Sequence, residues 1–170
     1  MSNVSQFIGS GWVPLETIEV TSAVATVNFN SNIDDTFNNY VVTGTHTLSV
    51  NNALIYCRLK TGDPSATINT SYRSLITYPG TSTNSTATNL TQATLSQYSG
   101  SFITYFMNLR SSDAFKSIVS QGTGYSGSTM LVRDYTNALL DTSIINGIQI
   151  TLNSGNINTG KFTLYGIKEL

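Results

Sequence analysis

Apolar and polar residues alternate along several short stretches of the chain with the period of two that is typical of a β-strand. The odd positions from 53 to 59 hold Ala, Ile, Cys and Leu, and the even positions between them hold Leu, Tyr and Arg. Val, Ile, Thr, Tyr and Phe dominate such stretches, whereas Glu, a strong helix former, occurs only three times. The pattern predicts strands over 15–21, 23–29, 40–50, 53–61, 101–109, 114–120, 129–135, 144–152 and 161–167, with a further short strand over 72–78. About 8–10 short strands separated by turn signals favour an all-β fold, an antiparallel sandwich or barrel.

Three segments between these stretches have the composition of turns or loops. Asn51-Asn52 resembles a two-residue hairpin turn because Asn tolerates positive φ, so the strands on either side are expected to pair. The glycine-rich run 122–127 (GTGYSG) predicts another turn. The run 81–94 (TSTNSTATNLTQAT) contains one large apolar residue, Leu90, and we predict a long exposed loop there.

Composition narrows the class of protein further. Charged residues make up 10% of the chain, well under the roughly 25% of an ordinary soluble domain, and the net charge is −1. The eight Lys and Arg are spread singly, so no basic stripe exists that could release counterions from nucleic acid or attract an anionic membrane. No apolar run approaches the roughly 18 residues of a membrane helix, and residues 1–12 lack the features of a secretory signal. We therefore expect neither a nucleic-acid nor a membrane partner.

The length favours one domain, for which we predict an N-terminal arm over 1–11 and a single folded unit over 12–170. Catalytic and cofactor motifs are missing from the sequence: it contains neither a phosphate-binding glycine loop nor a C-x-x-C pair. His46 is the only imidazole and falls inside a strand pattern, where a structural role is expected. The pair Asp34-Asp35 could ligate a cation, but turn chemistry explains it more simply. We expect no catalytic residue, no cofactor and no metal site.

Aromatic and apolar side chains remain as the candidate binding residues. The arm carries Phe7 and Ile8, and Trp12 follows a flexible Gly-Ser-Gly joint, so these three residues are candidate contacts to a neighbouring protein or to other copies of the chain. Tyr78, Tyr98 and Tyr125 fall in predicted loops and are candidate exposed contacts, where a Tyr could stack on a sugar or anchor a protein interface. The alternative is that most of these rings fill the core.

The two ends of the chain resemble a known family. The segments that show the resemblance are Trp12-Val-Pro-Leu-Glu-Thr-Ile, Ala23-Val-Ala-Thr-Val-Asn-Phe, Ile33-Asp-Asp-Thr-Phe-Asn-Asn-Tyr-Val-Val, Leu54-Ile-Tyr-Cys-Arg-Leu and Gly160-Lys-Phe-Thr-Leu-Tyr-Gly-Ile. They resemble jelly-roll virion proteins of tailed bacteriophages, a family that includes capsid decoration (cement) proteins and head- or tail-fibre modules. The likeness weakens between Thr61 and Gly100.

The resemblance implies a jelly-roll β-sandwich without catalysis, usually a homotrimer, in which Phe7, Ile8 and Trp12 are the candidate contacts to the capsid or within the trimer. Because the chain reads as one module without a shaft, the resemblance favours a decoration protein that is made in the host cytoplasm and binds the major capsid protein on the outer surface of the virion. The alternative is a fibre module that binds a receptor or a glycan. An enzyme such as a depolymerase is the third and least supported class, because no His and carboxylate constellation is evident.

Overall fold

A computed structural model describes residues 11–50, 53–62, 72–78, 81–87, 90–96, 99–126 and 129–168. The described residues contain β-strands and no helix, and all strand pairing between them is antiparallel. The strands are β1 (Trp12–Val20), β2 (Thr26–Phe29), β3 (Asn39–Leu48), β4 (Ala53–Thr61), β5 (Tyr72–Tyr78), β6 (Thr81–Ala87), β7 (Leu90–Ser96), β8 (Ser99–Met107), β9 (Lys116–Ser126), β10 (Thr129–Leu139), β11 (Ile145–Leu152) and β12 (Ile157–Ile167).

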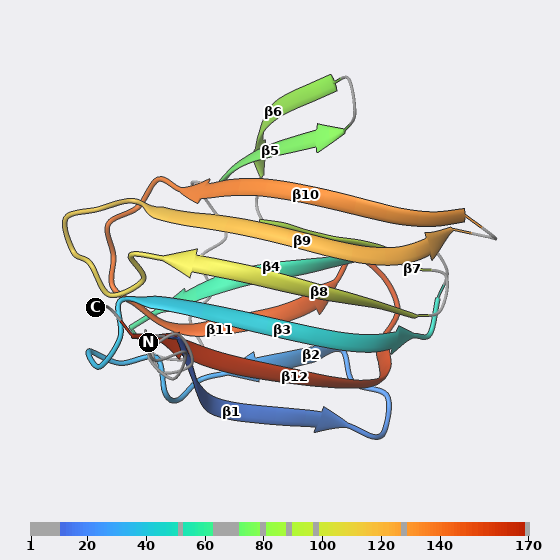
Figure 1. The fold of residues 1–170 in the computed structure, drawn as a ribbon, viewed down its shortest axis with the longest axis horizontal. Helices are drawn as coiled ribbons and strands as arrows, with labels where there is room; N and C mark the ends of the chain where they lie inside the picture. Colours follow the sequence, from blue (N-terminus) through green and yellow to red (C-terminus); the bar gives the residue numbers. More distant parts are fainter. Residues whose placement is uncertain are drawn as a thin grey trace, which may run out of the picture.

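The strands form two sheets. The larger has eight strands in the order β1-β12-β3-β8-β9-β10-β5-β6, and the smaller has four in the order β2-β11-β4-β7. Figure 1 shows the larger sheet as a broad layer from β1 to β10, with the β5–β6 hairpin projecting past β10 at one edge. This arrangement fits a β-sandwich, in which each sheet buries one face against the other.

Alternation along the strands explains the core between the sheets. Buried residues of β3, β8 and β12 on the larger sheet join those of β2, β4 and β11 on the smaller one in a single apolar cluster. Gly44 of β3 is needed within it, because a Cβ atom there would lie 2.5 Å from the Phe102 ring and 2.9 Å from the Phe162 ring. The two rings therefore occupy space that any larger residue at position 44 would take.

The predicted strands at both ends of the chain are confirmed, with boundaries shifted by a few residues. The predicted Asn51-Asn52 hairpin is wrong as a pairing, because β3 belongs to the larger sheet and β4 to the smaller one. Asn51 and Asn52 themselves lie outside the described residues. The connection between these strands crosses from one sheet to the other, which a local turn signal cannot indicate.

Two predicted irregular segments are strands instead. Most of the run 81–94 falls in β6 and β7, which pair with β5 and β4 respectively. Threonine supplied the misleading signal, because its hydroxyl suits a loop while its branched Cβ suits a strand. The predicted turn at 122–127 is mostly the end of β9, where Gly122 and Gly124 are buried and pair with Phe102 and Gly100.

Candidate interaction surface

An aromatic cluster lies on the outer face of the larger sheet, the face turned away from the smaller one. The ring of Trp12 on β1 is centred 5.5 Å from the ring of Tyr165 on β12 and 5.8 Å from the ring of Tyr105 on β8. Val41 of β3 pairs with both tyrosines and is fully buried, although it lies outside the central core. Trp12 thus lies across the sheet and covers Val41, while 41% of its own surface stays exposed. We call Trp12, Tyr105 and Tyr165 the aromatic cluster.

The cluster belongs to a row of apolar residues that runs across the sheet. Tyr165, Val41, Tyr105 and Val119 are successive partners on β12, β3, β8 and β9. All four point outward because each lies one residue away from a core position on its own strand. The sequence indicated part of this row, because the strand predicted over 101–109 has apolar residues on both of its faces. We expected a second packed layer to bury the outer face of this strand, but Met107 on that face and Val119 on the adjacent β9 are exposed to solvent.

Hydroxyl side chains fill the adjoining part of the same face. Three cross-strand pairs are hydrogen-bonded: Thr17 with Thr163 at 3.1 Å, Ser101 with Thr123 at 3.0 Å, and Thr47 with Thr159 at 2.7 Å. Pairs of this kind stabilise neighbouring strands without placing charge on the surface. The face also carries an exposed ion pair in which Lys161 Nζ lies 3.2 Å from a carboxylate oxygen of Glu19.

A second apolar group lies where β9 and β10 approach their connection. Tyr125 of β9 pairs with Met130 of β10, and these side chains are 49% and 59% exposed. Val132 is also exposed two residues further along β10. Tyr125 is therefore exposed as predicted, but on a strand and not in a loop. Met130 and Val132 were not identified from the sequence, because apolar residues on a strand predict the core when the facing layer is unknown.

The remaining candidate contacts can be placed only in part. Tyr78 is the last residue of β5, which confirms the short strand predicted over 72–78, so the expectation that Tyr78 lies in a loop is wrong. Phe7, Ile8 and Tyr98 lie outside the described residues. Of the candidates from the arm region, Trp12 alone is placed, and it packs on the outer sheet face.

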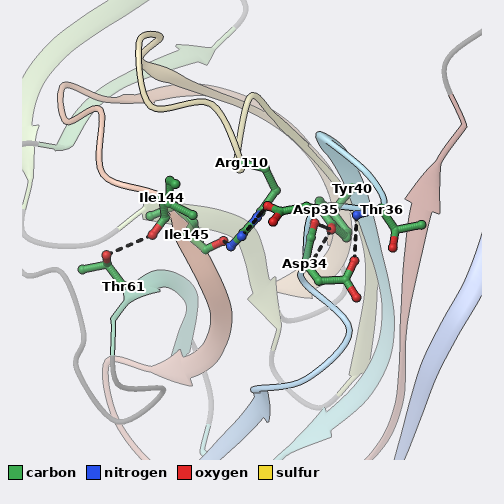
Figure 2. A network of polar contacts seen from close by, with 8 residues as sticks. All are labelled: Asp34, Asp35, Thr36, Tyr40, Thr61, Arg110, Ile144 and Ile145. Atoms are coloured by element: carbon green, nitrogen blue, oxygen red, sulfur yellow. Dashed lines mark hydrogen bonds and ion pairs between the residues drawn. The ribbon is translucent and has the colours of Figure 1, made fainter.

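A polar network holds one end of the sandwich together (Figure 2). Arg110 donates from Nε to Asp35 Oδ1 at 3.0 Å and from Nη1 to the Ile145 carbonyl at 3.1 Å. The Thr36 N–H donates to Asp34 Oδ1 at 2.9 Å, and this bond is the largest cause that lowers the pKa of Asp34. Asp34 thus performs turn chemistry, as predicted, whereas Asp35 forms an ion pair with Arg110. Each bond in this network joins loop to loop or loop to strand.

The single histidine and the single cysteine of the chain are both buried. His46 is 4% exposed on the inner face of β3, its two ring nitrogens have no hydrogen-bond partner, and burial lowers its pKa to about 4. Cys57 is fully buried on β4, and burial raises the pKa of its thiol. Within the described ranges, no three His, Cys, Asp or Glu side chains gather as a metal site requires. Nor do those ranges contain a helix long and apolar enough to cross a bilayer.

Neither a protein-family model nor a curated protein matches this chain.

Proposed function

We propose that this chain is a jelly-roll structural protein of a tailed-phage virion, and that it acts as a decoration protein on the outer capsid surface. The strand pairing carries the proposal. In the sheets, β1 pairs with β12, β2 with β11, β3 with β8, and β4 with β7. These are the nested pairs of one long hairpin, from its open end to its turn. The further pairs β12–β3 and β11–β4 roll that hairpin into two sheets.

A rolled hairpin of eight strands in two sheets is the jelly-roll arrangement. The hairpins β5–β6 and β9–β10 then count as additions that widen the larger sheet beyond β8. The step from this topology to a capsid role is an analogy, since a fold hosts many functions. The resemblance of the segments around β1 and β12 to phage virion proteins supports that step.

The surface chemistry supports a structural role. A decoration protein repeats over a symmetric shell, so many weak contacts give strong total binding through avidity. Hydroxyl pairs and exposed apolar side chains form such contacts without the cost of burying unpaired charge. On this proposal the chain is a homotrimer without enzymatic activity, and its partner is the major capsid protein. The aromatic cluster, with Trp12 exposed next to the arm, is the contact region.

Two measurements test the proposal. Light scattering should give a particle three times the 18.3 kDa mass of the chain. Purified protein should also rebind to capsids that lack it, and Trp12→Ala should weaken rebinding more than Phe115→Ala, which truncates an exposed aromatic residue outside the cluster. A monomer with no affinity for the capsid would refute the proposal.

The second candidate function is a fibre module that binds a host receptor. The exposed group of Tyr125, Met130 and Val132 favours it, because adjacent large apolar side chains on a surface are typical of interaction sites. In that case Tyr125→Ala would abolish binding to host cells, and the protein would be found on the tail or on fibres. Labelling of the capsid surface alone would exclude this candidate.

A further inference from the structure

We propose that a shallow hollow on the outer face of the larger sheet binds one ring of a neutral saccharide. The hollow measures about 360 Å³ and is lined by the outward side chains of Thr43, Thr45, Ser101, Lys161, Thr163 and Tyr165, together with Gly44 and Phe102. We call it the threonine hollow. The inference is drawn from the lining and concerns the free protein, because Tyr165 also belongs to the aromatic cluster proposed above as the capsid contact.

Strand register explains why the sheet is hollowed at this place. Lys161, Thr45 and Ser101 are partners across β12, β3 and β8, and Thr163 pairs with Thr43 in the row two residues away. These rows of mainly short side chains adjoin the row that holds Tyr165 and Tyr105. Tyr165 therefore forms one wall, Lys161 lies two rows away on the same strand, and the small side chains lie between them.

The lining combines hydroxyl groups with a larger share of apolar surface, as a sugar ring does. Each Ser or Thr hydroxyl has one donor and two acceptor positions. Thr163 and Ser101 each use part of that capacity on a neighbouring hydroxyl, Thr17 and Thr123 respectively, and retain further positions for a ligand. Tyr165 adds an aromatic ring to the lining, and the apolar C–H groups of a sugar can pack against such a ring.

Charge selects a neutral ligand over an acidic one. Lys161 is the charged residue of the lining, and Glu19 neutralises it at 3.2 Å. A carboxylate or phosphate in the hollow would have to compete with Glu19 for the ammonium group. A neutral sugar can instead accept a hydrogen bond from the ammonium group while Glu19 stays paired with it.

The size of the hollow favours a small ligand over a protein partner. The volume of the hollow lies within the usual range of small-molecule sites, about 300–1,000 Å³. A protein partner needs roughly 800 Å² of contact on each side and would extend over the aromatic cluster as well. A single sugar ring fits the hollow alone, and a longer glycan would continue past Tyr165.

Saturation-transfer difference NMR tests the proposal on the full chain, with methyl glycosides of glucose, galactose, mannose and N-acetylglucosamine as neutral probes and N-acetylneuraminic acid as the acidic probe. Thr43→Val keeps the side-chain shape and removes one hydroxyl, and Tyr165→Ala removes the aromatic wall. Thr47→Val is the matched control, since Thr47 lies on the same face of β3 but outside the lining. Circular dichroism verifies that each variant is folded.

We expect transfer to at least one neutral glycoside. Thr43→Val should weaken its binding by about threefold to tenfold, which corresponds to one hydrogen bond. Tyr165→Ala should weaken it at least as much, and Thr47→Val should leave it unchanged. If Tyr165→Ala does not fold, Thr43→Val decides the test alone. Absence of transfer to every neutral probe, preference for the acidic probe, or binding that Thr43→Val does not change would each overturn the proposal.

Discussion

One phenol oxygen joins Tyr40 to Asp34 through two hydrogen bonds of opposite direction. The Tyr40 hydroxyl donates to the Asp34 carbonyl at 2.9 Å and accepts from the Asp34 N–H at 3.1 Å. Tyr40 is fully buried, and burial raises its pKa to about 12. The strand β3 thereby fixes the loop that precedes it, the loop from which Asp35 meets Arg110 (Figure 2).

Replacement of this phenol should destabilise the fold without changing its shape. Tyr40→Phe keeps the ring and leaves both Asp34 backbone groups without their partner, so we expect a loss of about 1–3 kcal/mol in the free energy of unfolding. Urea denaturation measures it. Tyr125→Phe is the control on an exposed strand position and should change the stability by less than about 0.5 kcal/mol. Equal stability of the two variants would contradict the role of this bond pair.

Gly44 should not tolerate a side chain. Gly44→Ala places a methyl group 2.5 Å from the Phe102 ring, so the ring must move within a packed core. Overpacking of this kind typically costs about 1–3 kcal/mol, and the melting temperature should fall by several degrees. Gly11→Ala serves as the control, because a Cβ there has no neighbour within 4 Å. A melting temperature unchanged by Gly44→Ala would mean that the Phe102 ring is free to shift.

His46 should make the stability depend on pH between about 4 and 6.5. Its pKa falls from 6.5 to about 4 because burial disfavours the imidazolium, so the unfolded chain binds a proton in this interval and the folded chain does not. Stability should therefore be full above pH 6.5 and decrease as the pH falls toward 4.

His46→Leu isolates this effect. The variant should lose the pH dependence in that interval and should be at least as stable at pH 7, because it removes two buried nitrogens that lack partners. Asp34, Asp113 and Asp141 have pKa values lowered from 3.8, so the stability they contribute is lost mainly below this interval. Urea unfolding at several pH values gives the slope. The same slope in both proteins would assign the effect to other groups.

Loss of the Lys116 side chain should destabilise the fold more than loss of the Lys161 side chain. It is fully buried, and its Nζ donates to the carbonyls of Ser111, Ala114 at 2.9 Å and Thr142 at 3.4 Å, which joins the two loops at one end of the sandwich. Lys116→Met leaves these carbonyls without a donor and should cost about 1–3 kcal/mol. Lys161→Met breaks only an exposed ion pair and should cost under about 1 kcal/mol. Thermal unfolding of both variants compares them, and a reversed order would refute the prediction.

Cys57 should report unfolding directly. Its thiol is fully buried and its pKa is raised, so little thiolate exists and reagents cannot reach it in the folded chain. Ellman's reagent should react with the thiol in urea and be nearly inert toward native protein. Rapid reaction without denaturant would reveal local opening of β4.

The extent of β structure was predictable from the sequence because alternation is a local property. β4 is the clearest case, since its four apolar odd positions are all buried. Sheet membership was not predictable, because nothing near Asn51-Asn52 records that β3 and β4 belong to different sheets. The aromatic cluster shows the same limit. Trp12 and Tyr165 are 153 positions apart in the sequence, and their contact follows from the pairing of β1 with β12.

The position of β12 has a consequence for how the protein is made. It lies between β1 and β3, so β1 has no neighbour in its sheet until the segment Ile157–Ile167 has left the ribosome. Most of the sheet can assemble earlier, but β1 cannot pair, and Trp12 cannot contact Tyr165, before β12 has been made. Pairing between such distant segments slows folding and prolongs the time during which a nascent chain can aggregate. A chain with so few charges to repel its neighbours therefore depends strongly on the rapid addition of β12.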